Sequence, residues 1–228
     1  MTVVLLHALP LDERMWERQL EALRGHDVVA PRLYGRGRTM DEWAASVLDE
    51  VDGDALVLVG SSMGGYCALR MVAQASGRVR AVLLAGSRAD ADTEERRAVR
   101  AETLELLARD GAPGLWESMR PKLFGEGAPA EAVERARMLA LERSPEELTG
   151  AVEATRDRPD STDVARSLPL GLVLGDGDVY VDEEYARRLV AGSQHAWRLT
   201  VPDCGHLPAL EQPFVFNAVL VGALAQWT

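Results

Sequence analysis

Short runs of apolar residues recur along the chain and are separated by longer segments with helical periodicity. The runs are rich in Val and Leu and do not alternate with polar residues. Uninterrupted apolar runs of this length are typical of strands that are buried on both faces of a parallel sheet. We therefore predict six strands, at Thr2–Leu6, Val28–Leu33, Ala55–Gly60, Val79–Ala85, Leu170–Leu174 and Trp197–Val201.

Amphipathic segments lie between several of these runs. Apolar residues at helical spacing occupy one face of Trp16–Leu23 and one face of Met40–Val47. Near the C-terminus, Pro213 begins a last predicted helix that carries Phe214–Leu224. Strands that alternate with helices predict an α/β protein, with an open, mostly parallel sheet of about six strands and helices on both faces.

The alternation stops between Ser87 and Leu168, where no run resembles a strand. We expect residues 1–87 and 168–228 to form the core, and residues 88–167 to form a helical lid insertion. Such an insertion is expected over the carboxyl edge of the sheet, where ligands bind in open α/β folds. Its periodicity predicts three helices, at about Thr93–Arg109, Pro129–Arg143 and Ser144–Arg158.

Composition and charge narrow the class of protein. The chain has 228 residues, of which 47% are hydrophobic, and this is enough for one large core. With 25 basic and 36 acidic residues the net charge is −11, which disfavours binding to nucleic acids and anionic membranes. There is no basic leader and no apolar stretch of about 20 residues, so we expect a cytoplasmic protein. Cys67 and Cys204 fit two free thiols in a reducing compartment.

The strongest chemical signal is Gly60-Ser61-Ser62-Met63-Gly64, a GxSxG pattern. It follows a predicted strand and precedes a predicted helix over Tyr66–Ala75. In that context the serine sits on a sharp strand-to-helix turn, and the two glycines allow strand and helix to cross closely. The pattern predicts that Ser62 is a nucleophile.

A serine hydroxyl reacts well only when a base takes its proton. His206 lies in a loop after the last predicted strand, where an imidazole is free to point toward Ser62. His7, at the end of the first predicted strand, is the alternative base. His26 and His195 lie in polar connections and are expected to be exposed. We favour His206.

A carboxylate must fix the tautomer of the base. Asp178 lies in an acidic turn after the fifth predicted strand, and the order Ser62, Asp178, His206 is the one expected of a strand–turn–helix serine nucleophile. Asp176 is the alternative acid, although its side chain could instead bind its own turn. We prefer Asp178 because it extends from the loop beyond Gly177.

Two further features complete the predicted site. An oxyanion needs N–H donors, which we expect from the backbone of Met63 and of Leu9 in the loop after the first strand. No HExxH, CxxC or GxGxxG motif is present in a suitable context, so we expect neither a metal nor a cofactor. Four apolar residues of the helical segment are candidates either for an acyl pocket or for the core, namely Trp116, Met119, Phe124 and Met138.

Together these motifs resemble the α/β-hydrolase superfamily, and in particular its small lidded carboxylesterases, enol-lactonases and methylesterases. The resemblance implies that Ser62 is the nucleophile, that His206 is the base, that Asp178 orients it, and that Leu9 donates to the oxyanion. The segments that carry it are Leu5–Pro10, Gly35–Thr39, Gly60–Tyr66, Gly175–Asp178 and Gly205–Pro208.

The sequence thus predicts a cofactor-independent serine esterase that acts on small to medium acyl groups through an acyl-enzyme on Ser62. A lactonase or C–C bond hydrolase with the same three residues is the nearest alternative. A ligand-binding receptor with little turnover is the alternative from another class. We expect a small ester or lactone as the partner, no nucleic acid or membrane, and a monomer or homodimer.

Overall fold

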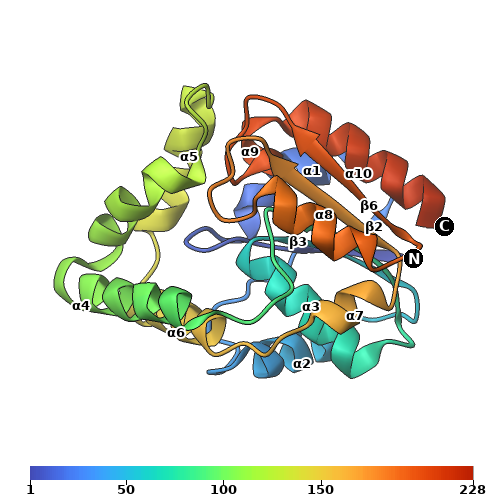
Figure 1. Ribbon diagram of the computed structural model, residues 1–228, viewed down its shortest axis with the longest axis horizontal. Coiled ribbons are helices and arrows are strands. Elements are labelled where there is room, and N and C mark those ends of the chain that lie inside the picture. Colours follow the sequence, from blue (N-terminus) through green and yellow to red (C-terminus); the bar gives the residue numbers. More distant parts are fainter. Residues whose placement is uncertain (228) are drawn as a thin grey trace.

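The computed structural model describes residues 1–227, and these form one sheet flanked by helices (Figure 1). The sheet has the order β2-β1-β3-β4-β5-β6, and each neighbouring pair of strands is parallel. The predicted open parallel sheet is therefore confirmed. Its strands are β1 (Thr2–Leu6), β2 (Asp27–Val29), β3 (Leu56–Ser61), β4 (Val79–Ala85), β5 (Leu170–Gly175) and β6 (Ala196–Val201).

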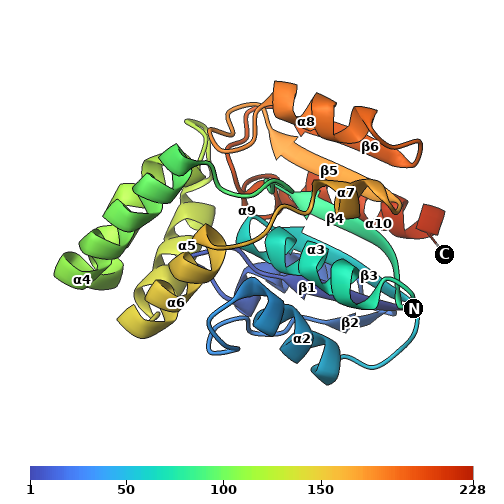
Figure 2. The same cartoon turned by 60° about the horizontal axis from the view of Figure 1, so that its bottom comes forward.

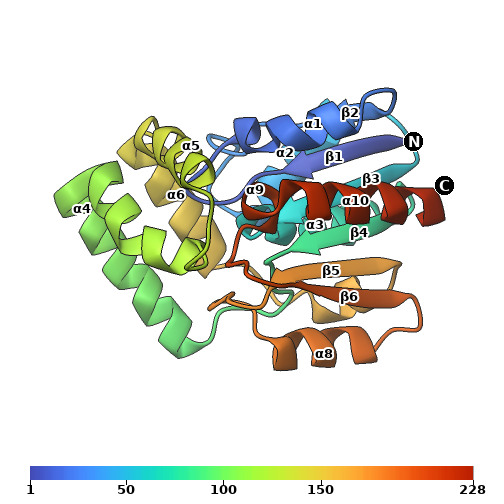
Figure 3. The same ribbon diagram turned by 90° about the horizontal axis from the view of Figure 1, so that it is seen from above.

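Helices cover both faces of the sheet. Figure 2 shows α2, α3 and α7 on one face, and Figure 3 shows α1 and α10 on the other. A short 3₁₀ helix, η1 (Glu13–Trp16), precedes α1. The α-helices are α1 (Glu17–Ala22), α2 (Met40–Glu50), α3 (Met63–Ala75), α4 (Glu94–Leu123), α5 (Ala130–Leu141), α6 (Pro145–Arg156), α7 (Thr162–Arg166), α8 (Glu183–Ala191), α9 (Pro208–Glu211) and α10 (Pro213–Trp227).

The two faces of the sheet carry separate apolar cores. Successive side chains of a strand point to opposite faces, so Val4 and Leu6 of β1 join the core under α2 and α3. Val3 and Leu5 join the core under α1 and α10. All four side chains are fully buried, which explains why the strands read as uninterrupted apolar runs.

One strand is shorter than predicted. The pattern extends the second strand to Leu33, whereas β2 ends at Val29. Pro31 follows closely and has no backbone N–H to donate to the sheet, so pairing cannot continue through it. The chain then turns across the carboxyl end of β1, where the N–H of Leu33 donates to Nε2 of His7 at 3.0 Å.

The segment between β4 and β5 is helical, and α4, α5 and α6 lie beyond the carboxyl ends of the strands (Figures 2 and 3). The sequence predicts a helix that ends near Arg109, followed by a linker. Instead, α4 bends at Gly111, whose φ of 62° lies in the left-handed region, and a second helical arm continues to Leu123. Pro113 is compatible with this arm because it lies in the first turn, where a missing N–H costs little.

The predicted insertion, residues 88–167, includes α7 (Thr162–Arg166), which packs beside α3. Ala165 of α7 is fully buried in the core under α2 and α3. α7 packs against α3 and α8 on one face of the sheet (Figure 2), and the limit of the insertion at residue 167 stays a prediction. Among the helices of residues 1–227, none combines the length and apolar character that crossing a membrane requires.

Candidate active site

Ser62 lies at the junction of β3 and α3, on a strained turn. Its φ of 49° and ψ of −113° are rarely adopted by residues other than glycine. Two close approaches impose this turn. A Cβ at Gly64 would overlap the carbonyl oxygen of Leu6, and a Cβ at Gly60 would overlap the backbone of Gly65. The glycines of the GxSxG pattern are therefore required by packing, and they leave the Ser62 hydroxyl at the carboxyl edge of the sheet.

The structure brings Ser62, His206 and Asp178 together. Oγ of Ser62 lies 2.8 Å from Nε2 of His206, and Nδ1 of His206 lies 2.9 Å and 3.0 Å from the two carboxylate oxygens of Asp178. The backbone N–H groups of Tyr180 and Val181 also donate to Asp178, at 2.8 Å and 3.1 Å. Because a carboxylate only accepts, the Nδ1 proton points to Asp178, and Nε2 is left free to accept the proton of Ser62.

A sequence model of the alpha/beta hydrolase family matches residues 3–219, which is almost the whole chain. The chain belongs to this family. It is similar to a thermophilic esterase from Thermogutta terrifontis, solved with malate bound, at 30% identity and a TM-score of 0.90, covering 100% of this chain and 91% of the esterase. No curated protein matches the sequence.

More distant structures share the fold of this hydrolase. The enol-lactonase from Burkholderia xenovorans LB400 is 22% identical, with a TM-score of 0.83 over 98% of this chain and 91% of its own. The bromoperoxidase from Bacillus anthracis is 20% identical, with a TM-score of 0.84 over 98% and 91% of the two chains. At these identities the likeness shows the architecture and leaves the substrate open.

Both ring nitrogens of His7, the alternative base, form hydrogen bonds with backbone groups. Its Nδ1 donates to the carbonyl oxygen of Ala8 at 3.2 Å, and its Nε2 accepts the N–H of Leu33 at 3.0 Å. Burial lowers the pKa of His7 to about 4. In the hydrolase His7 is thus a neutral support of the loop after β1. The other two histidines, His26 and His195, are exposed.

The alternative acid, Asp176, fastens the loop that carries His206. Its carboxylate accepts the N–H of Cys204 at 3.2 Å, and this hydrogen bond holds the pKa of Asp176 below its usual value. Gly175 permits the contact, because a Cβ there would overlap the carbonyl oxygens of Cys204 and Gly205. Asp176 therefore supports the histidine loop from outside, while Asp178 makes the contact with His206.

Glu211 is a buried carboxylate that the sequence reasoning missed. Only 2% of its surface is exposed, and its oxygens accept the N–H groups of Gly205 at 3.0 Å and Leu207 at 3.1 Å, on either side of His206. It also accepts the N–H of Gly125 at 2.8 Å, from the segment after α4. Glu211 thus ties the histidine loop to the helical segment. Its position five residues after His206, beside Pro208 and Pro213, was the available signal.

Gly86 and Ser87, at the end of β4, were also missed. Oγ of Ser87 donates to the carbonyl oxygen of Ser62 at 2.8 Å. Gly86 has a φ of 56°, and a Cβ there would lie 3.0 Å from Nδ1 of His206 and 3.2 Å from Oδ2 of Asp178. Their position directly after a buried parallel strand is the signal that could have found them, because such strand ends meet at one edge of the sheet.

Leu9 and Met63, whose backbone amides are the predicted oxyanion donors, are both buried, and Met63 directly follows Ser62. Met63 is the first residue of α3, so its N–H has no acceptor within the helix. Leu9 lies in the loop after β1, where the N–H of Leu11 donates to the carbonyl oxygen of Ala8 at 2.9 Å. Over residues 1–227, neither the Leu9 nor the Met63 amide donates to another protein group.

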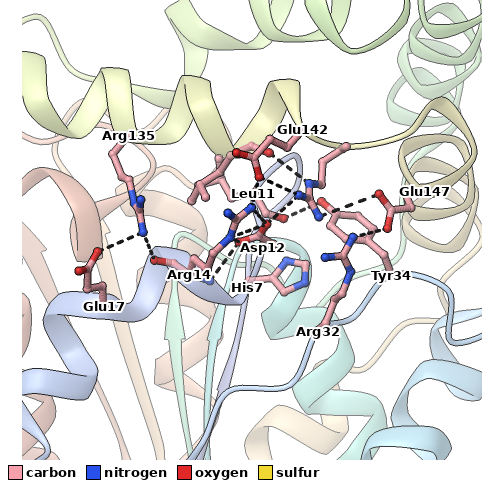
Figure 4. Close-up of polar contacts among 12 residues, drawn as sticks. His7, Leu11, Asp12, Arg14, Glu17, Arg32, Tyr34, Arg135, Glu142 and Glu147 are labelled. Atoms are coloured by element: carbon pink, nitrogen blue, oxygen red, sulfur yellow. Dashed lines mark hydrogen bonds and ion pairs between the residues drawn. The ribbon is translucent and has the colours of Figure 1, made fainter.

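An ionic network supports the loop that carries Leu9 (Figure 4). The side chain of Asp12 is fully buried and pairs with Arg14 at 2.6 Å and with Arg143, at the end of α5, at 3.1 Å. The hydroxyl of Tyr34 donates to the carbonyl oxygen of Leu11 at 2.7 Å. Burial raises the pKa of Asp12, but the hydrogen bonds from Arg14 and the charge of Arg143 bring it below its usual value. The network therefore joins the loop after β1 to the helical segment.

Three of the four candidate pocket residues lie together. Trp116 is buried, its ring centroid lies 6.3 Å from that of Phe124, and Met119 packs against both apolar cores. Met138 does not join them, since 44% of its surface is exposed. The physical reason is the turn of α5, which directs the neighbouring Leu139 into the core and Met138 outward.

Neither cysteine has the environment of a reactive thiol. Both are free and buried, and burial raises the pKa of Cys67 to about 12 and raises that of Cys204 as well. Over residues 1–227 no three His, Cys, Asp or Glu side chains gather in a way that could hold a metal ion.

Proposed function

We propose that this hydrolase is a serine esterase that cleaves carboxylic esters of small to medium acyl groups through an acyl-enzyme on Ser62. The observation that carries the proposal is the pair of contacts around His206. Its Nε2 lies 2.8 Å from Oγ of Ser62, and its Nδ1 lies 2.9 Å from Asp178. A nucleophile, a base and an orienting acid within hydrogen-bond reach are what acyl transfer by serine needs.

In the first half of the reaction, Oγ of Ser62 attacks the ester carbonyl as Nε2 of His206 takes the hydroxyl proton. Asp178 keeps the Nδ1 proton in place and stabilises the imidazolium that forms. The carbonyl oxygen becomes an oxyanion, and we assign the amides of Leu9 and Met63 as its donors. The C–O bond to the alcohol then breaks, and His206 returns the proton to the departing oxygen.

In the second half, water replaces the alcohol. His206 takes a proton from the water, whose oxygen attacks the acyl carbon, and the same two amides stabilise the second oxyanion. The bond between the acyl carbon and Ser62 breaks, and Oγ recovers its proton from His206. One ester and one water yield one acid and one alcohol, so the cycle uses no cofactor.

The substrate class rests on the helical segment, which we propose to act as a lid over the carboxyl edge. We assign Met119 and Phe124, which are partly buried beside the core residue Trp116, as an apolar wall suited to an acyl chain of modest size. The 30% identity with the Thermogutta esterase along the whole chain favours ester cleavage over the other activities of the family.

Hydrolysis of p-nitrophenyl acetate, butyrate, octanoate and palmitate tests the proposal. The wild type is compared with Ser62→Ala and with Ser61→Ala, a control whose buried Oγ makes no hydrogen bond within residues 1–227. We expect activity that peaks at short acyl chains, is lost in Ser62→Ala by at least about a thousandfold, and persists in Ser61→Ala. Equal activity of wild type and Ser62→Ala would overturn the proposal. Turnover of δ-valerolactone alone would make the protein a lactonase, and binding without turnover of any ester or lactone would make it a receptor.

A further inference from the structure

The chain as a whole is acidic, but one region beside the active site has the opposite charge. It lies where the loop after β4 enters α4 and meets the end of α6. We call it the arginine cluster. It comprises four arginines, Arg88, Arg96, Arg100 and Arg158, which share the carboxylates of Asp90 and Asp92.

The carboxylate of Asp90 forms ion pairs with two of the four arginines. Asp90 pairs with Arg88 at 2.8 Å and with Arg96 at 2.8 Å, and these bonds outweigh the effect of burial and lower the pKa of Asp90 to about 2. A third acid at the edge of the cluster, Asp160, is exposed and accepts the N–H of Ala91 at 3.3 Å. Arg88 and Arg96 are therefore both engaged by Asp90 within the protein, and Nε of Arg96 also lies 3.8 Å from Asp92.

The carboxylate of Asp92 pairs with Arg158 and with only one nitrogen of Arg100. Asp92 is fully buried at its side chain and pairs with Arg158 at 2.8 Å and with Nε of Arg100 at 3.2 Å. Arg158 is 3% exposed and lies over the ring of Tyr66, with its guanidinium carbon 3.9 Å from the centroid. Arg100 keeps 20% of its side chain exposed, and over residues 1–227 its two terminal nitrogens have no acceptor.

The arginine cluster lies beside the proposed catalytic residues. Nη1 of Arg88 donates to the carbonyl oxygen of Tyr180 at 3.2 Å. The ring of Tyr180 lies 4.6 Å from the ring of His206. Burial raises the pKa of the Tyr180 hydroxyl, and the positive charge of Arg100 opposes this rise. Tyr66 lies on the first turn of α3 after Ser62, and its ring lies under Arg158, which shares Asp92 with Arg100. Tyr180 thus contacts both His206 and the arginine cluster, in which Arg100 keeps two terminal nitrogens without an acceptor over residues 1–227.

We propose that Arg100, assisted by the hydroxyls of Tyr66 and Tyr180, binds a carboxylate carried by the substrate, so that the enzyme prefers esters with a free carboxylate. The inference rests on the serine esterase function proposed above. A guanidinium with two free N–H edges matches a carboxylate in a planar, two-bond geometry that neither a neutral ester nor an alkyl chain can satisfy. The net charge of −11 acts at long range and is screened by salt, whereas the arginine cluster acts at contact distance.

Matched pairs of substrates test the inference. The first pair consists of the mono-p-nitrophenyl ester of glutarate and its neutral methyl ester, repeated for succinate and adipate. The second pair places the carboxylate on the alcohol, as in butyryl glycolate and its methyl ester. The measured quantity is the ratio of kcat/KM for the charged member to that for the neutral member. Variants are Arg100→Met, Arg100→Lys and the control Arg97→Met, which removes an exposed charge from the same helix.

We expect the wild type to favour the charged member in at least one pair. In Arg100→Met the ratio falls about tenfold to a hundredfold, mainly through KM, because one charge-assisted contact is lost. Arg100→Lys retains part of the preference, and Arg97→Met retains all of it. Circular dichroism and thermal unfolding verify that each variant is folded.

A ratio that is the same in wild type, Arg100→Met and Arg97→Met overturns the inference, even when Ser62→Ala is inactive and the esterase function stands. If Ser62→Ala stays active, the esterase function fails instead. Calorimetry measures the dissociation constants of succinate, glutarate and adipate for Ser62→Ala, and so tests the carboxylate contact without turnover. Binding that Arg100→Met weakens supports the inference, and the absence of binding by all three dicarboxylates contradicts it.

Discussion

The side chain of Ser87 holds the backbone of Ser62. Oγ of Ser87 donates to the carbonyl oxygen of Ser62 at 2.8 Å, across the carboxyl ends of β3 and β4. Ser62 has a φ of 49°, a conformation that costs on the order of 1–3 kcal/mol for a residue other than glycine. The hydrogen bond offsets part of this cost, so a second serine on the neighbouring strand helps to keep the proposed nucleophile in its strained turn.

Replacing Ser87 by alanine removes this donor and leaves the N–H of Gly65, at 3.0 Å, as the remaining donor to the carbonyl oxygen of Ser62. We expect Ser87→Ala to lower the free energy of unfolding by about 1 kcal/mol and to reduce kcat severalfold, with little change in KM. Urea unfolding and ester hydrolysis measure the two effects. Ser76→Ala, at an exposed helix end, is the control. Unchanged kcat in a destabilised Ser87→Ala protein would show that the contact is only structural.

Gly86 is the point at which added volume would disturb the pair formed by His206 and Asp178. Its φ of 56° is unfavourable for alanine, and a Cβ would lie 3.0 Å from Nδ1 of His206. We therefore expect Gly86→Ala to reduce kcat by about a hundredfold or more. Gly77→Ala, where a Cβ has no neighbour within 4 Å, leaves kcat unchanged. Full activity in Gly86→Ala would mean that this pair does not need its present geometry.

Glu211 fixes the loop around His206 by accepting three backbone N–H groups while buried. Its amide counterpart presents N–H donors of its own, so Glu211→Gln turns accepted hydrogen bonds into donor–donor contacts. We expect a loss of about 2–3 kcal/mol of stability and a lower kcat. Chemical unfolding and steady-state kinetics provide the measurement, with the exposed Glu126→Gln as control. A Glu211→Gln protein as stable as wild type would refute the role.

The lowered pKa of Asp12 makes the stability of the folded protein depend on pH. Burial, which raises its pKa, is outweighed by the hydrogen bonds from Arg14, so the pKa of folded Asp12 lies below its usual value. A carboxyl with a lowered folded pKa contributes stability above about pH 4, and this contribution is lost as the pH falls through the folded value. We expect Asp12→Asn to cost about 2 kcal/mol at pH 7 and progressively less below pH 4. A difference that stays constant down to pH 2 would contradict the charge-based account.

The sequence predicts most of the sheet and the chain order of the site because both depend on local signals. Uninterrupted Val and Leu runs specify buried strands, and the Gly60 and Gly64 pair specifies the turn at Ser62. The end of β2 at Val29 was missed, although Pro31 marked it locally. The second arm of α4 beyond Gly111 was missed because tertiary packing of Trp116 outweighs the helix-breaking residues in its first turn.

The supporting contacts could not be predicted, because each joins residues that are distant in sequence. Ser87 reaches a carbonyl 25 positions away, and Glu211 reaches Gly125 across 86 positions. The pairing of Asp12 with Arg143 joins the loop after β1 to the end of α5. None of these partners lies at a helical or strand spacing, so only the assembled sheet edge reveals them.

Capture of the acyl-enzyme is the most direct test of the central claim. The protein is mixed with excess p-nitrophenyl acetate, the release of p-nitrophenol is followed by stopped flow, and quenched samples are digested for mass spectrometry. We predict a burst of about one equivalent of p-nitrophenol and an acetyl group on the peptide that contains Ser62, at the oxygen of Ser62. Both are absent in Ser62→Ala and present in Ser61→Ala. Ester hydrolysis with the acetyl group on another residue, or unaffected by Ser62→Ala, would contradict the account.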